Sequence, residues 1–183
     1  MCDDASGPIN PPGAGWAPFE RWTDRYDRWF DSEKGARIFR VEAAGLRELL
    51  VDVPRPWLEI GVGTGRFAQA LLVDEGIDPS PAVLRYAAER GIRTRVGQGE
   101  NLPYENGRFG AVLLIVTICF LRNPPRVFSE CHRVLQPGGF LLLGFVPRNS
   151  SWGRACMAAG QRGHPFYAPA TFHTTAEIVS LCK

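Results

Sequence analysis

The stretch WLEIGVGTG at residues 57–65 decides the fold, because it joins a short apolar run directly to a glycine-rich turn. The segment that follows, residues 66–72, has the pattern of a short helix. A strand, a glycine loop and a helix in this order bring backbone N–H groups and a helix N-terminus close to a ligand. A side chain at Gly61, Gly63 or Gly65 would block either a positive φ or the close approach of the backbone. We therefore expect a ligand-binding loop here.

Glu59 is the only charged residue of the apolar run. Burying a carboxylate without a partner is costly, so we expect a cationic or hydrogen-bond donor group beside it. With the three glycines it completes an acid-x-Gly-x-Gly-x-Gly pattern, which resembles motif I of the class I S-adenosylmethionine-dependent methyltransferases. Nicotinamide and flavin Rossmann domains also carry a glycine loop, but their fingerprint needs a small residue where this chain has Arg66. A tight turn without a ligand is a further alternative.

Length and composition indicate one globular domain, which we place at residues 19–183. The chain has 183 residues, of which 45% are hydrophobic and 22% are charged, and its net charge is +2. That is enough apolar material for a sizeable core. Nucleic-acid-binding domains normally show a clustered basic face, so the near-neutral balance predicts no nucleic-acid partner.

The five cysteines are odd in number and scattered, with no Cys-x-x-Cys spacing. This pattern argues against a disulfide framework and against a zinc site, so we expect reduced thiols and no metal. No run reaches the roughly 18 apolar residues of a membrane span, and the N-terminus lacks the chemistry of a signal peptide. A cytoplasmic protein without a membrane partner is the resulting expectation.

Residues 1–18 are rich in proline and glycine and are predicted to be disordered. Aromatic residues between positions 19 and 30 then recur at helical spacing, which predicts one helix with Trp22 and Phe30 packed on the core. In the methyltransferases that this chain resembles, a Tyr-Asp-x-Trp-like segment near the N-terminus folds over the cofactor. That resemblance implies a lid role for Tyr26, and simple core packing is the alternative.

Apolar periodicity and the positions of Pro and Gly predict the other elements. Because strands and helices alternate, the expected fold is α/β, a Rossmann-like three-layer sandwich with a mostly parallel sheet. The family usually ends in an antiparallel hairpin for which no sequence is left here, so a C-terminally truncated domain is expected. Residues 147–173 show no periodicity. The expected helices are residues 33–50, 67–72, a segment capped by Ser80, a segment opened by Asn123, and a segment from Thr174; the expected strands are residues 76–78, 94–96, 109–121 and 140–146.

Asp78 and Pro79 stand at the end of the second predicted strand. An acid at the carboxyl end of this strand is where a Rossmann-like fold holds ribose hydroxyls, because a carboxylate can accept two hydrogen bonds from a vicinal diol. We therefore predict that Asp78 binds the ribose, with Pro79 beside it. Capping the helix that begins at Ser80 is the alternative role for this carboxylate.

The segment GQGENLPY at residues 97–104 resembles the Gly-Asp-Ala-Glu-x-Leu-Pro-Phe segment of the same methyltransferases. The resemblance implies that Gln98, Gly99 and Glu100 contact the adenine. Gln98 departs from the Asp of that pattern, although its carbonyl oxygen can accept the same hydrogen bond. An ordinary polar turn is the alternative.

Val116 and Thr117 lie near the carboxyl end of the longest apolar run and are predicted to line the floor of the cofactor site. Methyl transfer needs a base only if the acceptor must lose a proton. His164 and His173 fall in the segment expected to wall the acceptor, and they are weak candidates for that contact. His132 is expected on the surface or in packing.

The sequence therefore favours an S-adenosylmethionine-dependent methyltransferase acting on a small-molecule acceptor. One alternative is an NAD-dependent Rossmann oxidoreductase. Another is a non-catalytic S-adenosylmethionine-binding protein, suggested by Gly110 at a position where the family usually has Asp, and by the short C-terminus. The acceptor and the oligomeric state are left open.

Overall fold

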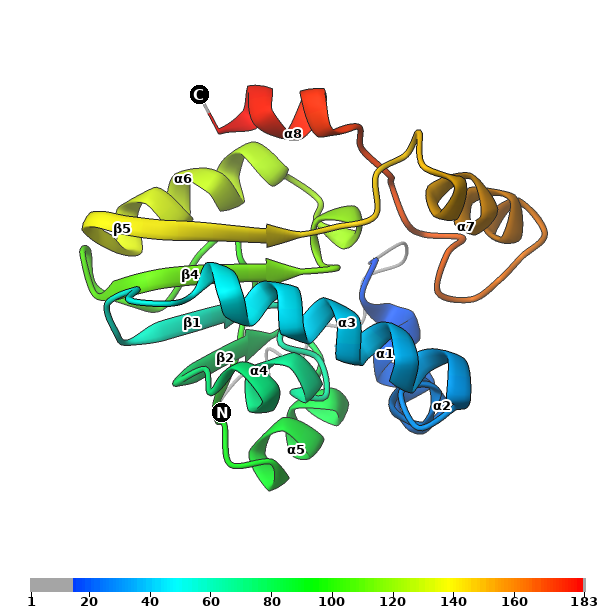
Figure 1. The fold of residues 1–183 in the computed structure, drawn as a ribbon, viewed down its shortest axis with the longest axis horizontal. Coiled ribbons are helices and arrows are strands. Elements are labelled where there is room, and N and C mark those ends of the chain that lie inside the picture. The colour runs from blue at the N-terminus through cyan, green and yellow to red at the C-terminus, as the bar shows by residue number, and fades with distance from the viewer. Residues whose placement is uncertain (1–14, 183) are drawn as a thin grey trace, which may run out of the picture.

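The computed structural model describes residues 15–182. Within these residues the chain forms a five-stranded sheet of order β3-β2-β1-β4-β5, in which every neighbouring pair is parallel (Figure 1). The strand order reverses between β1 and β4, and such a switch point opens a crevice at the carboxyl ends of the strands. The strands are β1 (Trp57–Ile60), β2 (Glu75–Asp78), β3 (Arg93–Val96), β4 (Phe109–Ile115) and β5 (Leu135–Gly144).

Helices cover both faces of the sheet, which gives the predicted three-layer arrangement. One face packs against α3, α4 and α5, and the other packs against α6. In Figure 1 the strand arrowheads point toward α1, α2 and α7, which therefore lie at the carboxyl edge of the sheet. The helices are α1 (Ala17–Arg21), α2 (Thr23–Trp29), α3 (Glu33–Leu49), α4 (Arg66–Leu71), α5 (Pro81–Glu89), the 3₁₀ turn η1 (Ile118–Phe120), α6 (Pro124–Val134), α7 (Ser151–Gln161) and α8 (Thr175–Leu181).

The central strand β4 is buried along its whole length. Ala111 and Leu113 belong to the core beneath α3 to α5, whereas Val112 and Leu114 belong to the core beneath α6. A parallel strand covered on both faces reads as a continuous apolar run, so two-sided burial explains this part of the sequence.

The predicted helix starts are confirmed by their caps. The Ser80 hydroxyl oxygen accepts a hydrogen bond from the Val83 N–H at 3.4 Å, and Asn123 caps α6 in the same way. Thr174 and Glu177 form a reciprocal capping box at the start of α8. Each cap satisfies N–H groups that the first helical turn leaves without a backbone partner.

The ordered chain begins earlier than predicted. Residues 1–14 of the segment expected to be disordered lie outside the described residues, but Gly15 is buried and α1 starts at Ala17. Pro18 is accommodated because it lies in the first helical turn, where its missing N–H costs no hydrogen bond.

The aromatic segment forms two short helices, so the prediction of a single helix is wrong. The break falls at Trp22, whose φ of −123° and ψ of 31° are not helical. Trp22 is 39% exposed, against expectation, whereas Phe30 is buried as predicted.

Two strand boundaries also differ from the prediction. β4 ends at Ile115 rather than at residue 121, because Val116 has a φ of +54° that no strand can continue. β5 begins at Leu135, before the turn expected to separate it from α6. The pairs Phe109–Leu135 and Ala111–Phe140 are separated by a register shift, so the intervening residues bulge out of the strand.

The segment expected to lack periodicity, residues 147–173, contains the eleven-residue helix α7. Ser150 caps it by accepting a hydrogen bond from the Gly153 N–H at 2.9 Å. Helix α8 packs on α6 through Ile178 and Phe128 and is the last element described. No helix within residues 15–182 is long and apolar enough to cross a membrane.

Candidate cofactor and acceptor site

A cavity of about 330 Å³ lies at the carboxyl ends of β1, β2 and β4. Its floor comes from the sheet and its loops, and its other walls come from α1, α2, α3, α7 and the loop after α7. Most of the residues predicted to bind a cofactor meet here. Those that line the cavity are Tyr26, Gly61, Gly63, Asp78, Pro79, Gln98, Gly99, Glu100, Val116 and Thr117.

The glycine loop after β1 adopts positive φ values of +70°, +54° and +79° at Gly61, Gly63 and Gly65. An added Cβ at Gly61 would lie 2.4 Å from Cγ2 of Thr117, and one at Gly65 would lie 2.9 Å from the Cα of Ala87. At Gly63 an added Cβ would meet its neighbours only at ordinary van der Waals distance. Gly63 is therefore the position where the loop backbone is open to the cavity.

Asp78 ends β2 and connects two parts of the site. Its Oδ2 accepts a hydrogen bond from the Gly63 N–H at 3.0 Å, and its Oδ1 accepts one from the Ser80 N–H at 2.9 Å. Burial raises the pKa of Asp78 to about 6, although these two N–H groups oppose the rise. Because each carboxylate oxygen can accept a second hydrogen bond, shaping the turn and binding a diol are compatible roles.

Glu59 and Gly65 do not line the cavity, so direct contact of these two residues with a cofactor is not supported by the geometry. Gly65 serves the packing of the loop on α5. Glu59 is only 2% exposed, and its Oε2 has no hydrogen-bond partner in the described part of the chain. Burial and the nearby charge of Asp78 raise the pKa of Glu59 well above its ordinary value. An unpartnered buried carboxyl oxygen of this kind is unusual in a folded protein.

Tyr26 packs beside the glycine loop at Gly63. Its ring lies 3.6 Å from where a Cβ of Gly63 would stand. The ring packs edge-on against Phe19 and Phe30, with centroid distances of 5.0 and 5.5 Å. Burial raises the pKa of the Tyr26 hydroxyl, and the charge of Glu59 adds to the rise, so the hydroxyl stays neutral.

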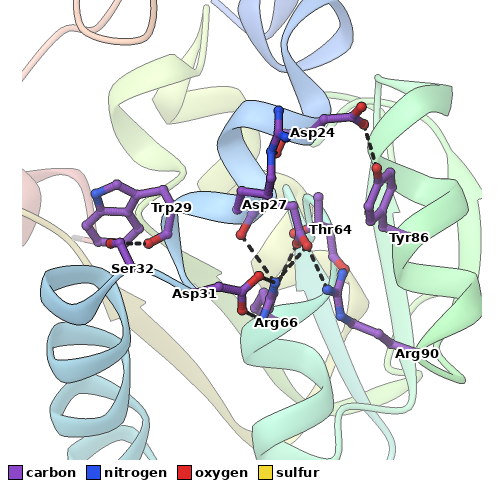
Figure 2. A network of polar contacts seen from close by, with 10 residues as sticks. Asp24, Asp27, Trp29, Asp31, Ser32, Thr64, Arg66, Tyr86 and Arg90 are labelled. Atoms are coloured by element: carbon purple, nitrogen blue, oxygen red, sulfur yellow. Dashed lines mark hydrogen bonds and ion pairs between the residues drawn. The ribbon is translucent and has the colours of Figure 1, made fainter.

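An acidic stripe fastens α1 and α2 to the body of the domain. It consists of Glu20, Asp24, Asp27 and Asp31, which lie four, three and four residues apart in the sequence. The Glu20 carboxylate accepts hydrogen bonds from the Ser80 hydroxyl at 2.5 Å and from a backbone N–H of α5 at 3.1 Å. Asp24 accepts a hydrogen bond from the hydroxyl of Tyr86, also on α5, at 2.5 Å (Figure 2).

Asp27 is the centre of this stripe and is 6% exposed. Figure 2 shows Arg66 from α4 and Arg90 from the end of α5 converging on it. The Arg90 Nη2 donates a hydrogen bond to its Oδ2 at 2.9 Å, and Arg66 also reaches Asp31 at 2.8 Å. Burial alone would raise the pKa of Asp27, but hydrogen bonds from the two arginines outweigh burial and lower it to about 2.

The segment predicted to contact the adenine is held by the start of α6. The Glu100 side chain accepts a hydrogen bond from the Asn123 N–H at 3.3 Å, and its carbonyl oxygen accepts one from Arg126 at 3.1 Å. The Glu100 carboxylate therefore has a structural role, which is to join this segment to the start of α6. Gln98 is exposed at the cavity edge and keeps its side-chain amide available.

The acceptor-side wall brings one of the two candidate histidines to the cavity. His164 lines it and stacks on Tyr167, with ring centroids 4.3 Å apart and an interplanar angle of 20°. His173 lies outside the lining, and its carbonyl oxygen accepts a hydrogen bond from the Arg148 N–H at 2.8 Å. His132 is exposed on α6, in agreement with its predicted surface position.

These features fit a nucleoside-like cofactor. Asp78 offers acceptors for vicinal hydroxyls, and Gly63 leaves the loop backbone open to a ligand. Among residues 15–182 no group of three or more His, Cys, Asp or Glu side chains is arranged to hold a metal ion.

Comparison with known proteins decides the family. A family model described as a methyltransferase domain matches residues 58–143, which run from β1 into β5. A solved structure from Thermotoga maritima, an S-adenosylmethionine-dependent methyltransferase, is 35% identical with a TM-score of 0.80. The match covers 92% of this chain and 78% of that one. This chain belongs to the S-adenosylmethionine-dependent methyltransferases.

Two further relatives show how the length of this chain compares with that of similar proteins. An uncharacterized Methanocaldococcus jannaschii protein is 32% identical over 166 residues, covering 90% of this chain and 78% of the relative. An uncharacterized Mycobacterium tuberculosis protein is 44% identical over 156 residues, covering 85% of this chain and 55% of the relative. The methyltransferase thus spans about half the length of the mycobacterial relative.

Family membership confirms the predicted fold class and cofactor and removes the NAD-dependent oxidoreductase from consideration. The acidic stripe and its arginine partners were not anticipated from the sequence. The signal that could have revealed them is the helical spacing of four acids in a segment whose other face is aromatic.

Proposed function

We propose that this chain transfers a methyl group from S-adenosylmethionine to a small-molecule acceptor. The observation that carries the proposal is one cavity that joins the glycine loop and Asp78 to an aromatic wall built from α1, α2 and the α7 region. Methyl transfer needs both parts of this cavity, because the acceptor atom must lie in line with the bond between the sulfur and the methyl carbon, and water must be excluded.

Each part of the site has a role in this proposal. S-adenosylmethionine supplies a methyl group activated by its positively charged sulfur. The Asp78 carboxylate accepts hydrogen bonds from the ribose hydroxyls, and the Gln98 carbonyl oxygen accepts one from the adenine amino group. Tyr26 closes the site over Gly63 and keeps water away from the reacting atoms.

The proposal also covers the location of the protein in the cell and the class of its acceptor. We place it in the cytoplasm, with reduced thiols, because Cys119, Cys131 and Cys156 are buried and unpaired. The net charge of +2 and an acceptor wall made mainly of aromatic side chains favour a small molecule over a nucleic acid.

The test is turnover with S-adenosylmethionine carrying a tritiated methyl group, in the presence of a low-molecular-weight extract as a pool of acceptors. We expect transfer of label to an extractable product. Asp78→Asn should abolish this transfer, whereas Glu89→Gln, a substitution at an exposed position at the end of α5, should leave it unchanged. Binding of S-adenosylhomocysteine by a folded chain that transfers no label to any pool would favour the non-catalytic alternative.

A further inference from the structure

The acceptor half of the cavity is lined by flat side chains. Phe166 lies 5.2 Å from Phe19 and 6.0 Å from Tyr26 between ring centroids, which links the loop after α7 to the lid helices. Trp152 from α7 and Phe172 complete this wall. Walls of this kind suit a planar ring, because aromatic pairs gain from offset-stacked and edge-to-face contacts beyond their burial.

His164 is one of two residues lining the cavity that have a buried side-chain nitrogen without a partner among the described residues; the other is Trp16, whose indole N–H can only donate. The Nδ1 of His164 is buried and has no hydrogen-bond partner in the described part of the chain, although the residue lines the cavity. Burial lowers its pKa and the charge of Arg25 lowers it further, so the imidazole is neutral near pH 7. A neutral imidazole with a free ring nitrogen can take up a proton from a ligand.

The charges around this half of the cavity favour an acceptor that becomes negative over one that is positive. Arg25 from α2 lines it, and Lys34 from α3 lies with its Nζ 4.9 Å from the Trp152 ring centroid. On the same side, Glu42 is the acid that lines the wall, and burial raises its pKa. Arg122 adds a further cation to the lining. The other titratable groups there are Tyr26, Cys119, Cys156 and Tyr167, whose pKa values burial raises, so all four are neutral near pH 7.

We propose that the acceptor is a planar aromatic molecule methylated on a hydroxyl group, and that His164 takes the proton of that hydroxyl. This inference rests on the proposed function. The O–H bond breaks, its proton passes to the imidazole of His164, and the electron pair left on the oxygen forms the new O–CH₃ bond. The electron pair of the broken S–C bond stays on sulfur, giving S-adenosylhomocysteine, and His164 returns its proton to solvent. Arg25 stabilises the negative charge that develops on the oxygen.

The test uses 2-naphthol, whose fluorescence emission differs between the neutral and the ionised form, with and without saturating S-adenosylhomocysteine. We expect saturable binding to the full chain and a pKa of bound naphthol at least one unit below that of free naphthol. His164→Gln removes the proton acceptor at similar volume, and we expect it to abolish this shift and to weaken binding about tenfold. His132→Gln, the matched substitution at an exposed histidine, leaves both unchanged.

A second variant covers the case in which His164→Gln does not fold. Arg25 is exposed, so Arg25→Gln is expected to fold and to reduce the shift in the pKa of naphthol by at least half. An unchanged shift in both variants would overturn the roles assigned to them. Equal binding of 2-methoxynaphthalene, which has no proton to give, would also overturn the proposal.

Two outcomes separate this inference from the proposed function. Binding of S-adenosylhomocysteine without any binding of 2-naphthol, or with preference for naphthylmethylammonium, overturns the acceptor class and leaves the methyltransferase intact. Failure of S-adenosylhomocysteine to bind overturns the proposed function, whereas the naphthol titration without cofactor still reports on His164.

Discussion

Arg66 holds both carboxylate oxygens of Asp27, with Nε 3.0 Å from Oδ1 and Nη2 2.7 Å from Oδ2. This fork-like contact joins the helix after the glycine loop to the lid helix α2. Asp27 is the neighbour of Tyr26 in the chain, so the contact anchors the helix that carries Tyr26. This helix is thus held by a buried charge cluster.

Asp27→Asn is expected to destabilise the domain by about 3 kcal/mol, because it leaves Arg90 without its carboxylate partner and leaves Arg66 with the exposed Asp31 alone. Asp31→Asn is the matched control, since the side chain of Asp31 contacts the same Arg66 but is 61% exposed. It should cost less than about 1 kcal/mol. Urea unfolding measures the free energy of unfolding of both variants. Equal losses of stability in Asp27→Asn and Asp31→Asn would show that burial of the ion pair does not add to stability.

Asp27 also predicts a limit to acid stability. Its folded pKa of about 2 lies below the ordinary value of 3.8. The stabilisation is therefore fully present above the ordinary pKa and is lost as the pH falls from about 4 to about 2, by about 2 kcal/mol. The difference in unfolding free energy between the wild type and Asp27→Asn should shrink across that window. A constant difference from pH 6 to pH 2.5 would contradict the lowered pKa.

The features predicted correctly from the sequence are those that short segments encode. The glycine loop, the Ser80, Asn123 and Thr174 caps and the buried run of β4 each depend on residues within a few positions of one another. Membership of a parallel α/β sheet followed from their alternation. The same locality explains why Asp78 and Gln98 could be assigned to the cavity in advance.

The features that were missed depend on contacts between distant segments. Helix α7 contains two glycines that suggest a loop, yet an added Cβ at Gly153 would lie 2.1 Å from the Pro147 carbonyl oxygen. At Gly160 it would lie 2.7 Å from the Tyr167 carbonyl oxygen, so both glycines allow close packing. The role of Arg66 likewise required knowing that α2 lies beside α4, which no local pattern states.

Gly63→Ala and Gly91→Ala form a matched pair, because both positions have positive φ and neither added Cβ meets a tight contact. Each should therefore lose about 1 kcal/mol of stability from backbone strain. Only Gly63 lines the cavity, so only Gly63→Ala should weaken binding of S-adenosylhomocysteine, by at least tenfold. Thermal unfolding and calorimetry measure the two effects, and equal affinities in the two variants would remove Gly63 from the site.

Asp78 predicts a pH dependence of cofactor binding. Its pKa of about 6, raised by burial, means that the carboxylate becomes protonated within an accessible range. The ionised form accepts both ribose hydroxyls, so affinity for S-adenosylhomocysteine should rise about fivefold from pH 5 to pH 6, about tenfold from pH 5 to pH 7, and level off above pH 7. Titrations in Asp78→Asn should lose this slope, and a slope that persists in the variant would assign it to another group.

The most direct test of the account is calorimetric titration of the purified chain with S-adenosylhomocysteine and with NADH, in the wild type and in Asp78→Asn. We predict that S-adenosylhomocysteine binds one-to-one, that NADH does not bind, and that the substitution weakens binding at least tenfold without unfolding the protein. Binding of S-adenosylhomocysteine that is indifferent to Asp78→Asn, or no binding by a folded chain, would contradict the site described for this methyltransferase.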